Sequence, residues 1–183
     1  MEPEENSKLT KDTMFFYIPV GRLVIMSILT SNFYVAYWMY KNWKVIKSQE
    51  NSDISPFWRG VFGIFFIYNL FEIIPDNYKA KSSYKANFSS DLAILFIIYA
   101  LVGTLVSKAS GWLDIPVLTY WGVLISTFNF MFLIPAQKYI NTVNETIEPK
   151  PMYNEWSIGH FVCLILGISS WALFIYGILA QLG

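Results

Sequence analysis

Charged residues are scarce in this chain: they make up 14% of its 183 residues, against about 25% in a typical soluble domain. The 13 Lys and Arg balance the 13 Asp and Glu, so no overall basic field favours a nucleic-acid partner, and we expect none. One cysteine excludes an intramolecular disulfide, and one histidine leaves too few ligands for a zinc site. Acid–base or nucleophilic chemistry would need convergent titratable groups, so we expect neither enzyme activity nor a cofactor.

Apolar residues, in contrast, make up 55% of the chain and aromatic residues 19%. Apolar stretches with Trp and Tyr near their ends are typical of helices in lipid. The chain begins MEPEE, which is acidic rather than basic. We therefore expect a polar N-terminal tail over 1–13 and no cleaved signal peptide.

Five apolar stretches have the length of membrane spans, because a bilayer core of about 30 Å needs about 20 apolar residues as helix. We predict an all-α integral membrane protein, a single transmembrane domain over 1–183 that bundles about five helices. The third stretch is short enough to be re-entrant, and this alternative stays open. The expected spans cover about 20–40, 57–75, 91–107, 114–136 and 157–181.

The chain also repeats itself at an offset of 97 residues. The IPV of 18–20 returns as IPV at 115–117, and eight of the 24 positions from Ile18 to Lys41 are identical to their counterparts. If the two intervening stretches both cross the membrane, the repeated helix pairs are inverted relative to each other, as in many transporters. If only one of them crosses, the repeats are parallel. Chance similarity between apolar helices is the simpler explanation.

Several motifs resemble those of a family of small bacterial multi-pass membrane proteins that is uncharacterised. They are YWMYKNWK at 37–44, SPFWR at 55–59, and IPAQ at 134–137 followed by IN at 140–141. The resemblance implies a bacterial cytoplasmic (inner) membrane location but no activity. Two positions depart from the pattern: Asn32 stands where the family usually has Gly, and Val35 where it has an acidic residue.

Three asparagines, Asn32, Asn69 and Asn129, lie inside expected spans. Asn32 and Asn129 are equivalent in the repeat, so they are candidates for a polar site near the middle of the membrane. The simpler interpretation is that all three form hydrogen bonds between helices.

Arg22, Glu72 and His160 fall near one end of the predicted bundle. Ionisable groups at membrane depth are costly and often functional, so an Arg22–Glu72 pair with His160 as a titrating group is one hypothesis. The alternative is that these side chains reach the lipid headgroups from helix ends.

Lys41, Lys44 and Lys47 recur every third residue after the first span, on a predicted interfacial extension of its helix. They are candidates for anionic lipid headgroups, although ordinary stop-transfer charges would look the same. Ser55 and Pro56 predict the start of the next helix, as N-cap and first-turn residue.

Two classes of function remain. The first is a non-enzymatic membrane component that binds membrane lipids, a partner membrane protein or copies of itself. Gly167, Ser169 and Ser170 would allow the close helix approach that a homo-oligomer needs. The second is a small transporter or channel with a polar site between inverted repeats.

Overall fold

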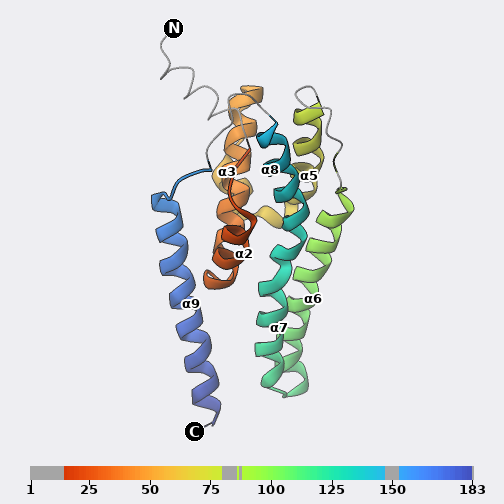
Figure 1. Cartoon of the computed structure of the whole chain (residues 1–183). Helices are drawn as coiled ribbons and strands as arrows, with labels where there is room; N and C mark the ends of the chain where they lie inside the picture. The colour runs from red at the N-terminus through yellow and green to blue at the C-terminus, as the bar shows by residue number, and fades with distance from the viewer. Residues whose placement is uncertain (1–14, 80–85, 87, 147–152, 183) are drawn as a thin grey trace.

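The computed structural model describes residues 15–79, 86, 88–146 and 153–182, and these residues form helices and connecting segments without a strand. Figure 1 shows the helices packed side by side in one elongated bundle. In chain order they are α2 (Val20–Leu29), α3 (Phe33–Glu50), α4 (Pro56–Val61), α5 (Gly63–Lys79), α6 (Asp91–Leu113), α7 (Val117–Thr127), the 3₁₀ helix η1 (Phe128–Leu133), α8 (Ile134–Glu145) and α9 (Ile158–Leu182).

Three helical stretches are long and apolar enough to cross a membrane: α6, the run from Val117 to Glu145, and α9 over Ile158–Ala180. They indicate a membrane protein and confirm the helical class. In Figure 1, α3 and α5 end at one end of the bundle, which we call the polar end, and the turn between α6 and α7 lies at the opposite end, which we call the turn end. Helix α6 runs from the polar end towards the turn end. The run from α7 through α8 returns, and α9 then descends beside α2 and α3.

The stretch 20–40 does not form the single helix that we predicted, because the chain reverses between α2 and α3. Near the start of α2, the Arg22 guanidinium lies 5.3 Å from the ring centre of Trp156, just before α9. Near its end, the carbonyl of Ile28 accepts a hydrogen bond of 2.9 Å from Trp171 Nε1, halfway along α9. Helix α2 therefore runs in the same direction as α9.

Helix α3 runs back towards the polar end. The Cys163 thiol lies 3.6 Å from the carbonyl oxygen of Phe33, at the start of α3. One turn later, the Tyr37 hydroxyl lies 2.7 Å from Ser157 Oγ, at the beginning of α9. Helices α2 and α3 are therefore a helical hairpin, whose tip lies beside the middle of α9.

Local backbone geometry explains the reversal. The amide of Asn32 donates to the Ser27 carbonyl at 3.0 Å, and the amide of Ser31 to that of Ile28 at 3.2 Å, which is the Schellman pattern that ends many helices. Ser31 and Asn32 both have left-handed backbones, with φ of 46° and 70°. Asn adopts this region more readily than most residues, whereas Ser is unusual there. The turn residues Thr30, Ser31 and Asn32 are polar but uncharged and are flanked by apolar residues, so hydropathy averaged over a whole span does not reveal the turn.

The predicted second span, 57–75, is also divided into α4 and α5. Arg59 of α4 and Phe66 of α5 both lie against Trp43 of α3. The guanidinium of Arg59 lies 4.3 Å from the ring centre of Trp43. Gly60 packs on the backbone of Ala36, and Gly63 packs on Met39. Helix α4 therefore runs antiparallel to α3, and α5 runs parallel to α3. The predicted start is confirmed, since Ser55 is the N-cap of α4 and Pro56 its first residue.

The sequence repeat is not clearly visible as two similar structural units. Both copies break at the same place, since α2 ends before Asn32 and α7 ends before Asn129. The first copy turns back there, while the second continues through η1 into α8. Helices α2 and α7 run in opposite directions, but α3 and α8 both run towards the polar end. The inverted pairs that we predicted are therefore not evident.

An extended segment, residues 15–19, is buried in the polar half of the bundle, with Phe16 2% and Ile18 0% exposed. Amide side chains bind its backbone: Asn42 accepts from the Phe16 amide at 2.9 Å. Gln137 donates to the Phe16 carbonyl at 3.1 Å, and Asn141 to the Ile18 carbonyl at 2.9 Å. Because buried backbone groups need partners, these side chains make non-helical backbone possible here.

Tyr17, in the same segment, pairs its backbone with Asn154: its amide donates to Asn154 Oδ1 at 2.8 Å, and its carbonyl accepts from the Asn154 amide at 2.7 Å. Its ring stacks on Tyr153 at 4.3 Å. Burial, with the neighbouring Tyr153 and Glu145, raises the pKa of Tyr17 to about 12. The phenol therefore stays neutral throughout the physiological range.

Gly167 on α9 permits the close approach of the hairpin tip. A methyl group there would overlap Thr30 Cα and lie 2.6 Å from the Leu29 carbonyl oxygen. Of the three small residues that we considered for self-association, Gly167 thus packs within the chain. On the same helix, a methyl group at Gly177 would meet only Tyr120, at 3.7 Å.

We expect Gly167→Ala to destabilise the protein by about 1–3 kcal/mol, because backbone atoms of α2 must move to accommodate the methyl group. Gly177→Ala is the matched control on α9 and should be neutral or slightly stabilising. Thermal unfolding of the purified variants in detergent measures both. Equal stability of the two variants would show that α9 does not pack on the tip as described.

Candidate functional site

The second apolar stretch that is long enough to span a membrane, Val117–Glu145, is interrupted where α7 ends at Thr127, because six residues of 3₁₀ helix precede α8. Pro135, in the first turn of α8, accounts for part of this geometry. It has no amide hydrogen, and its ring crowds the carbonyl four residues earlier, which disfavours a regular α-helix. Mid-helix 3₁₀ segments often mark functional or strained positions.

The tip of the α2–α3 hairpin meets this interruption. The side-chain amide of Asn32 donates a hydrogen bond of 2.6 Å to the carbonyl oxygen of Ser126, one turn before Asn129. The C-terminal ends of α2, at Leu29, and of α7, at Thr127, therefore come together beside Asn32. The end of α2 carries a partial negative charge from its aligned peptide dipoles, whereas α7 continues into η1.

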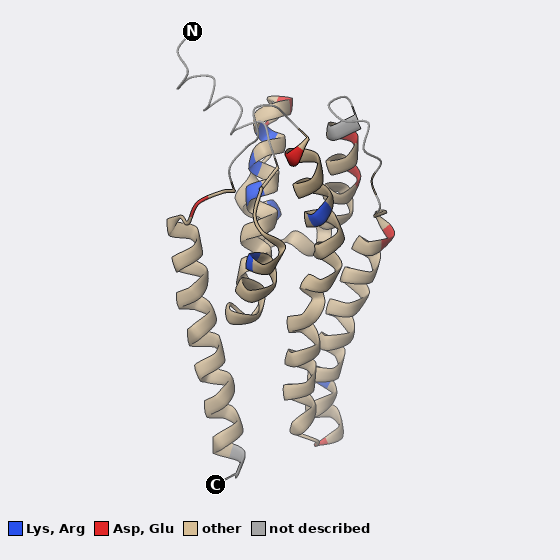
Figure 2. Ribbon diagram, viewed as in Figure 1, with Lys and Arg blue, Asp and Glu red and all other residues tan. Residues whose placement is uncertain are grey.

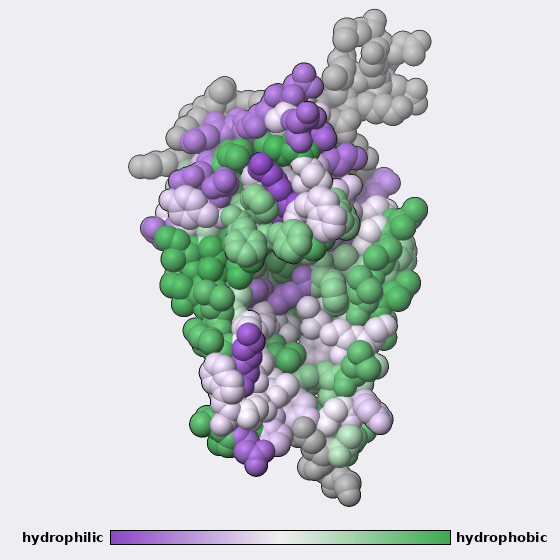
Figure 3. Space-filling model, turned by 180° about the vertical axis from the view of Figure 1, so that it is seen from behind, coloured by the Kyte–Doolittle hydropathy of each residue, from purple (hydrophilic) through white to green (hydrophobic). Residues whose placement is uncertain are grey.

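Three side-chain oxygens at this junction are buried and have no hydrogen-bond partner among the described residues. They are Ser27 Oγ, Asn32 Oδ1 and Asn129 Oδ1, which we call the tip oxygens. Ser27 is 0% and Asn129 8% exposed. Leaving a buried polar group unpaired costs about 1–3 kcal/mol, so these three oxygens are candidates for binding a further group. On the face drawn in Figure 3, polar residues show in a hollow at mid-height between apolar flanks.

The third asparagine that we singled out, Asn69, does not belong to this junction. It is exposed on α5, whose neighbours include α3, α4, α6 and α8. Glu72 is likewise exposed on α5. Arg22 donates instead to the carbonyl oxygen of Asn154 and lies over the Trp156 ring. The Arg22–Glu72 pair that we hypothesised is therefore not formed.

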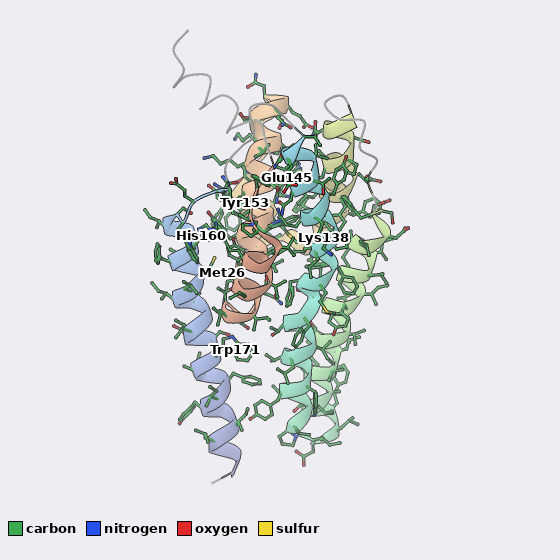
Figure 4. All side chains as sticks on the ribbon, viewed as in Figure 1. Met26, Lys138, Glu145, Tyr153, His160 and Trp171 are labelled. Carbon is green, nitrogen blue, oxygen red and sulfur yellow. The ribbon has the colours of Figure 1, made fainter. Side chains whose placement is uncertain are left out.

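His160 is fully buried rather than extended towards the headgroups. Its Nδ1 accepts a hydrogen bond of 3.0 Å from the Ser157 amide, so His160 takes the place of the acidic residue in a capping box at the start of α9. Since Nδ1 is an acceptor, the proton lies on Nε2, which is 3.2 Å from the Tyr34 hydroxyl. Figure 4 shows His160 at the polar-end start of α9. The geometry gives it a structural role.

Charged side chains gather at the polar end (Figure 2). Lys44 and Lys47 are exposed on the last turns of α3, and the Lys41 ammonium lies 5.4 Å from the ring centre of Phe16. Among the described residues, the charged side chains of the turn end are Lys108 and Asp114. The three lysines therefore lie where lipid headgroups would meet the polar end.

Sequence reasoning missed Ser27 and the amides that bind the extended segment, Asn42, Gln137 and Asn141. The available signal was the presence of amide residues next to apolar runs, which we used only for the three asparagines inside spans. No protein-family model matches the chain, and neither a curated protein nor a solved structure matches it. Function is therefore inferred from the site itself.

Proposed function

We propose that this chain is a small multi-pass membrane protein that binds a small polar solute at the tip oxygens and lets it cross the membrane, as a carrier or channel. One observation carries the proposal: two helix interruptions are joined at mid-bundle by the bond from Asn32 to Ser126, and Ser27, Asn32 and Asn129 on these segments have buried side-chain oxygens without a partner among the described residues. No catalytic step is part of it, and no cofactor is required.

General properties of membrane proteins support this choice. Non-helical backbone at membrane depth is tolerated where it is buried in protein or lines a water-filled cavity. Transporters commonly place their solute sites at such broken helices, with the helix ends directed at the solute. Polar groups inside a membrane bundle that lack a structural partner are functional candidates for the same reason.

We further propose three crossings, with the α2–α3 hairpin entering the membrane from the polar end without traversing it. The described Lys and Arg residues other than Lys108 lie towards the polar end, and the positive-inside rule then places that end in the cytoplasm. The bacterial inner membrane is the location that the motif resemblance implies. Anionic lipids would contact Lys41, Lys44 and Lys47 at this surface, where each charge contributes about 1 kcal/mol.

A second candidate, a scaffold that binds a partner membrane protein or another copy of itself, is favoured by the exposure of α9. Only 11% of the 18-residue apolar stretch of α9 that qualifies it as a candidate membrane span is buried. In the turn-end half it meets α7 through Tyr120, whose ring lies 5.4 Å from that of Phe174. Lipid alone would cover the remaining apolar surface, so this observation is compatible with either function.

Permeability of proteoliposomes tests the proposed function. Vesicles with the purified protein and protein-free vesicles are exposed to osmotic gradients of glycerol, urea and the sodium, potassium and ammonium salts of a lipid-permeant anion such as thiocyanate, which crosses with the cation and keeps charge balanced. Volume changes are followed by stopped-flow light scattering. We expect protein-dependent entry of at least one of these probes. If none of them enters faster than in protein-free vesicles, the scaffold is the better account.

A further inference from the structure

We propose that the tip oxygens form a binding site for a small monovalent cation, an alkali-metal ion or ammonium. This inference rests on the proposed function, because it names the class of solute held at the same site. The groups left unpaired at the junction are all oxygens, and oxygen is the ligand that hard cations prefer.

Hydrogen bonds connect two of the residues that carry these oxygens, Ser27 and Asn32, and join Asn32 to Ser126, which precedes the third, Asn129, by one turn. The backbone of Ser27 accepts from the amide of Asn32, so both residues belong to the turn itself. The Nδ2 group of Asn32 donates to the carbonyl oxygen of Ser126. The Oδ1 atom of the same side chain has no partner among the described residues. Asn129 follows Ser126 by one turn of the interrupted helix and is nine-tenths buried. The junction thus presents acceptors from both interrupted segments.

The local field favours a cation. Helix α2 ends here, and a helix C-terminus attracts positive charge, whereas α7 continues into η1. The one charged residue of α2, Arg22, lies at the opposite end of that helix and is bonded to Asn154. An anion would meet oxygens and a negative helix end, so it would be disfavoured.

The charge of the ligand follows from its surroundings. Helices α2, α7 and η1 contain no Asp or Glu. Divalent calcium and magnesium are usually bound through one or more carboxylates. Neutral oxygens and a helix end compensate a single charge better than a double one, which points to a monovalent ion.

Thermal unfolding of the full chain in detergent tests the site without any transport assay. The unfolding midpoint is measured in sodium, potassium, ammonium and choline chloride at equal ionic strength. Because a ligand of the folded state raises its stability, we expect at least one small cation to raise the midpoint by about 5 °C over choline, which is too large for the site. Asn129→Leu and Asn32→Gly should each abolish the difference, while Asn69→Leu, on the surface of α5, should retain it.

Equal midpoints in all four salts would overturn the cation site and leave an ordered water as the occupant of the tip. A cation-dependent rise that survives in both tip variants would overturn it as well, because the ion would then bind elsewhere. If wild-type permeability is protein-dependent but the midpoints are equal, the proposed function stands and the solute class is wrong. If small cations stabilise the protein but no probe crosses, the site stands and transport is wrong.

Discussion

Asn129→Leu is expected to lower protein-dependent solute flux by about tenfold to a hundredfold while the protein remains folded. Leu has the same number of side-chain heavy atoms as Asn and branches at the same carbon, but it offers no oxygen. Losing one hydrogen-bonding or coordinating group costs about 1–3 kcal/mol of binding, and each 1.4 kcal/mol is a factor of ten. The Oδ1 atom of Asn129 has no partner among the described residues, so its removal breaks no bond to the fold through that atom.

Asn32 requires a different substitution. Its φ of 70° lies in the left-handed region, where Leu would strain the turn and confuse a loss of flux with a loss of structure. Asn32→Gly keeps this backbone conformation and removes the amide, so it isolates the contribution of the side chain. We expect the double variant Asn32→Gly with Asn129→Leu to show no flux above protein-free vesicles.

The matched control is Asn69→Leu, which removes an amide that is exposed on α5. It should retain wild-type flux. Normal flux in the double variant would reject the tip as the site of passage. Equal loss in Asn69→Leu would show that the assay reports general damage rather than the tip.

Gln137→Leu is expected to destabilise the fold by about 3 kcal/mol or more. The Gln137 side chain is fully buried and donates to the Phe16 carbonyl at 3.1 Å and to Asn141 Oδ1 at 2.7 Å. It also accepts from Trp38 Nε1 at 2.5 Å. Leu would leave these groups without that partner, and each buried orphan costs about 1–3 kcal/mol.

Thermal unfolding followed by tryptophan fluorescence measures this effect, because the buried Trp38 and Trp43 are among the seven tryptophans that contribute to the signal. Lys138→Leu is the control, because Lys138 is exposed next to Gln137 on α8. Substitutions at such surface positions usually change stability by about 0.5 kcal/mol or less. If Gln137→Leu is as stable as Lys138→Leu, the amide network does not hold the extended segment.

Part of this architecture follows from composition alone. The third and fifth predicted spans, 91–107 and 157–181, correspond to α6 and α9, whose starts at Asp91 and Ile158 lie within one residue of prediction. These helices are uniformly apolar between polar segments, so hydropathy locates them. The helical extension predicted beyond Lys41 is also present, since α3 continues to Glu50.

The two hairpins could not be read from composition, because neither reversal contains a charged residue or a proline and apolar residues flank both. At Ser31 and Asn32 the turn depends on two left-handed backbones, and neither residue is the Gly that usually signals one. The repeat nevertheless drew attention to Asn32 and Asn129, which lie where the two helices are interrupted. Their surroundings depend on tertiary contacts, such as the bond from Asn32 to Ser126, which no local pattern encodes.

The most direct test of the three-crossing account is the sidedness of two lysines. Lys47 lies near the polar end of α3, and Lys108 near the turn end of α6. With the buried Cys163 replaced by Ala, single cysteines at these positions are labelled with a membrane-impermeant maleimide in oriented membrane vesicles. We predict that Lys47→Cys and Lys108→Cys react from opposite sides of the membrane. Five crossings would place both on one side, so labelling from the same side would contradict the re-entrant hairpin and the site built on its tip.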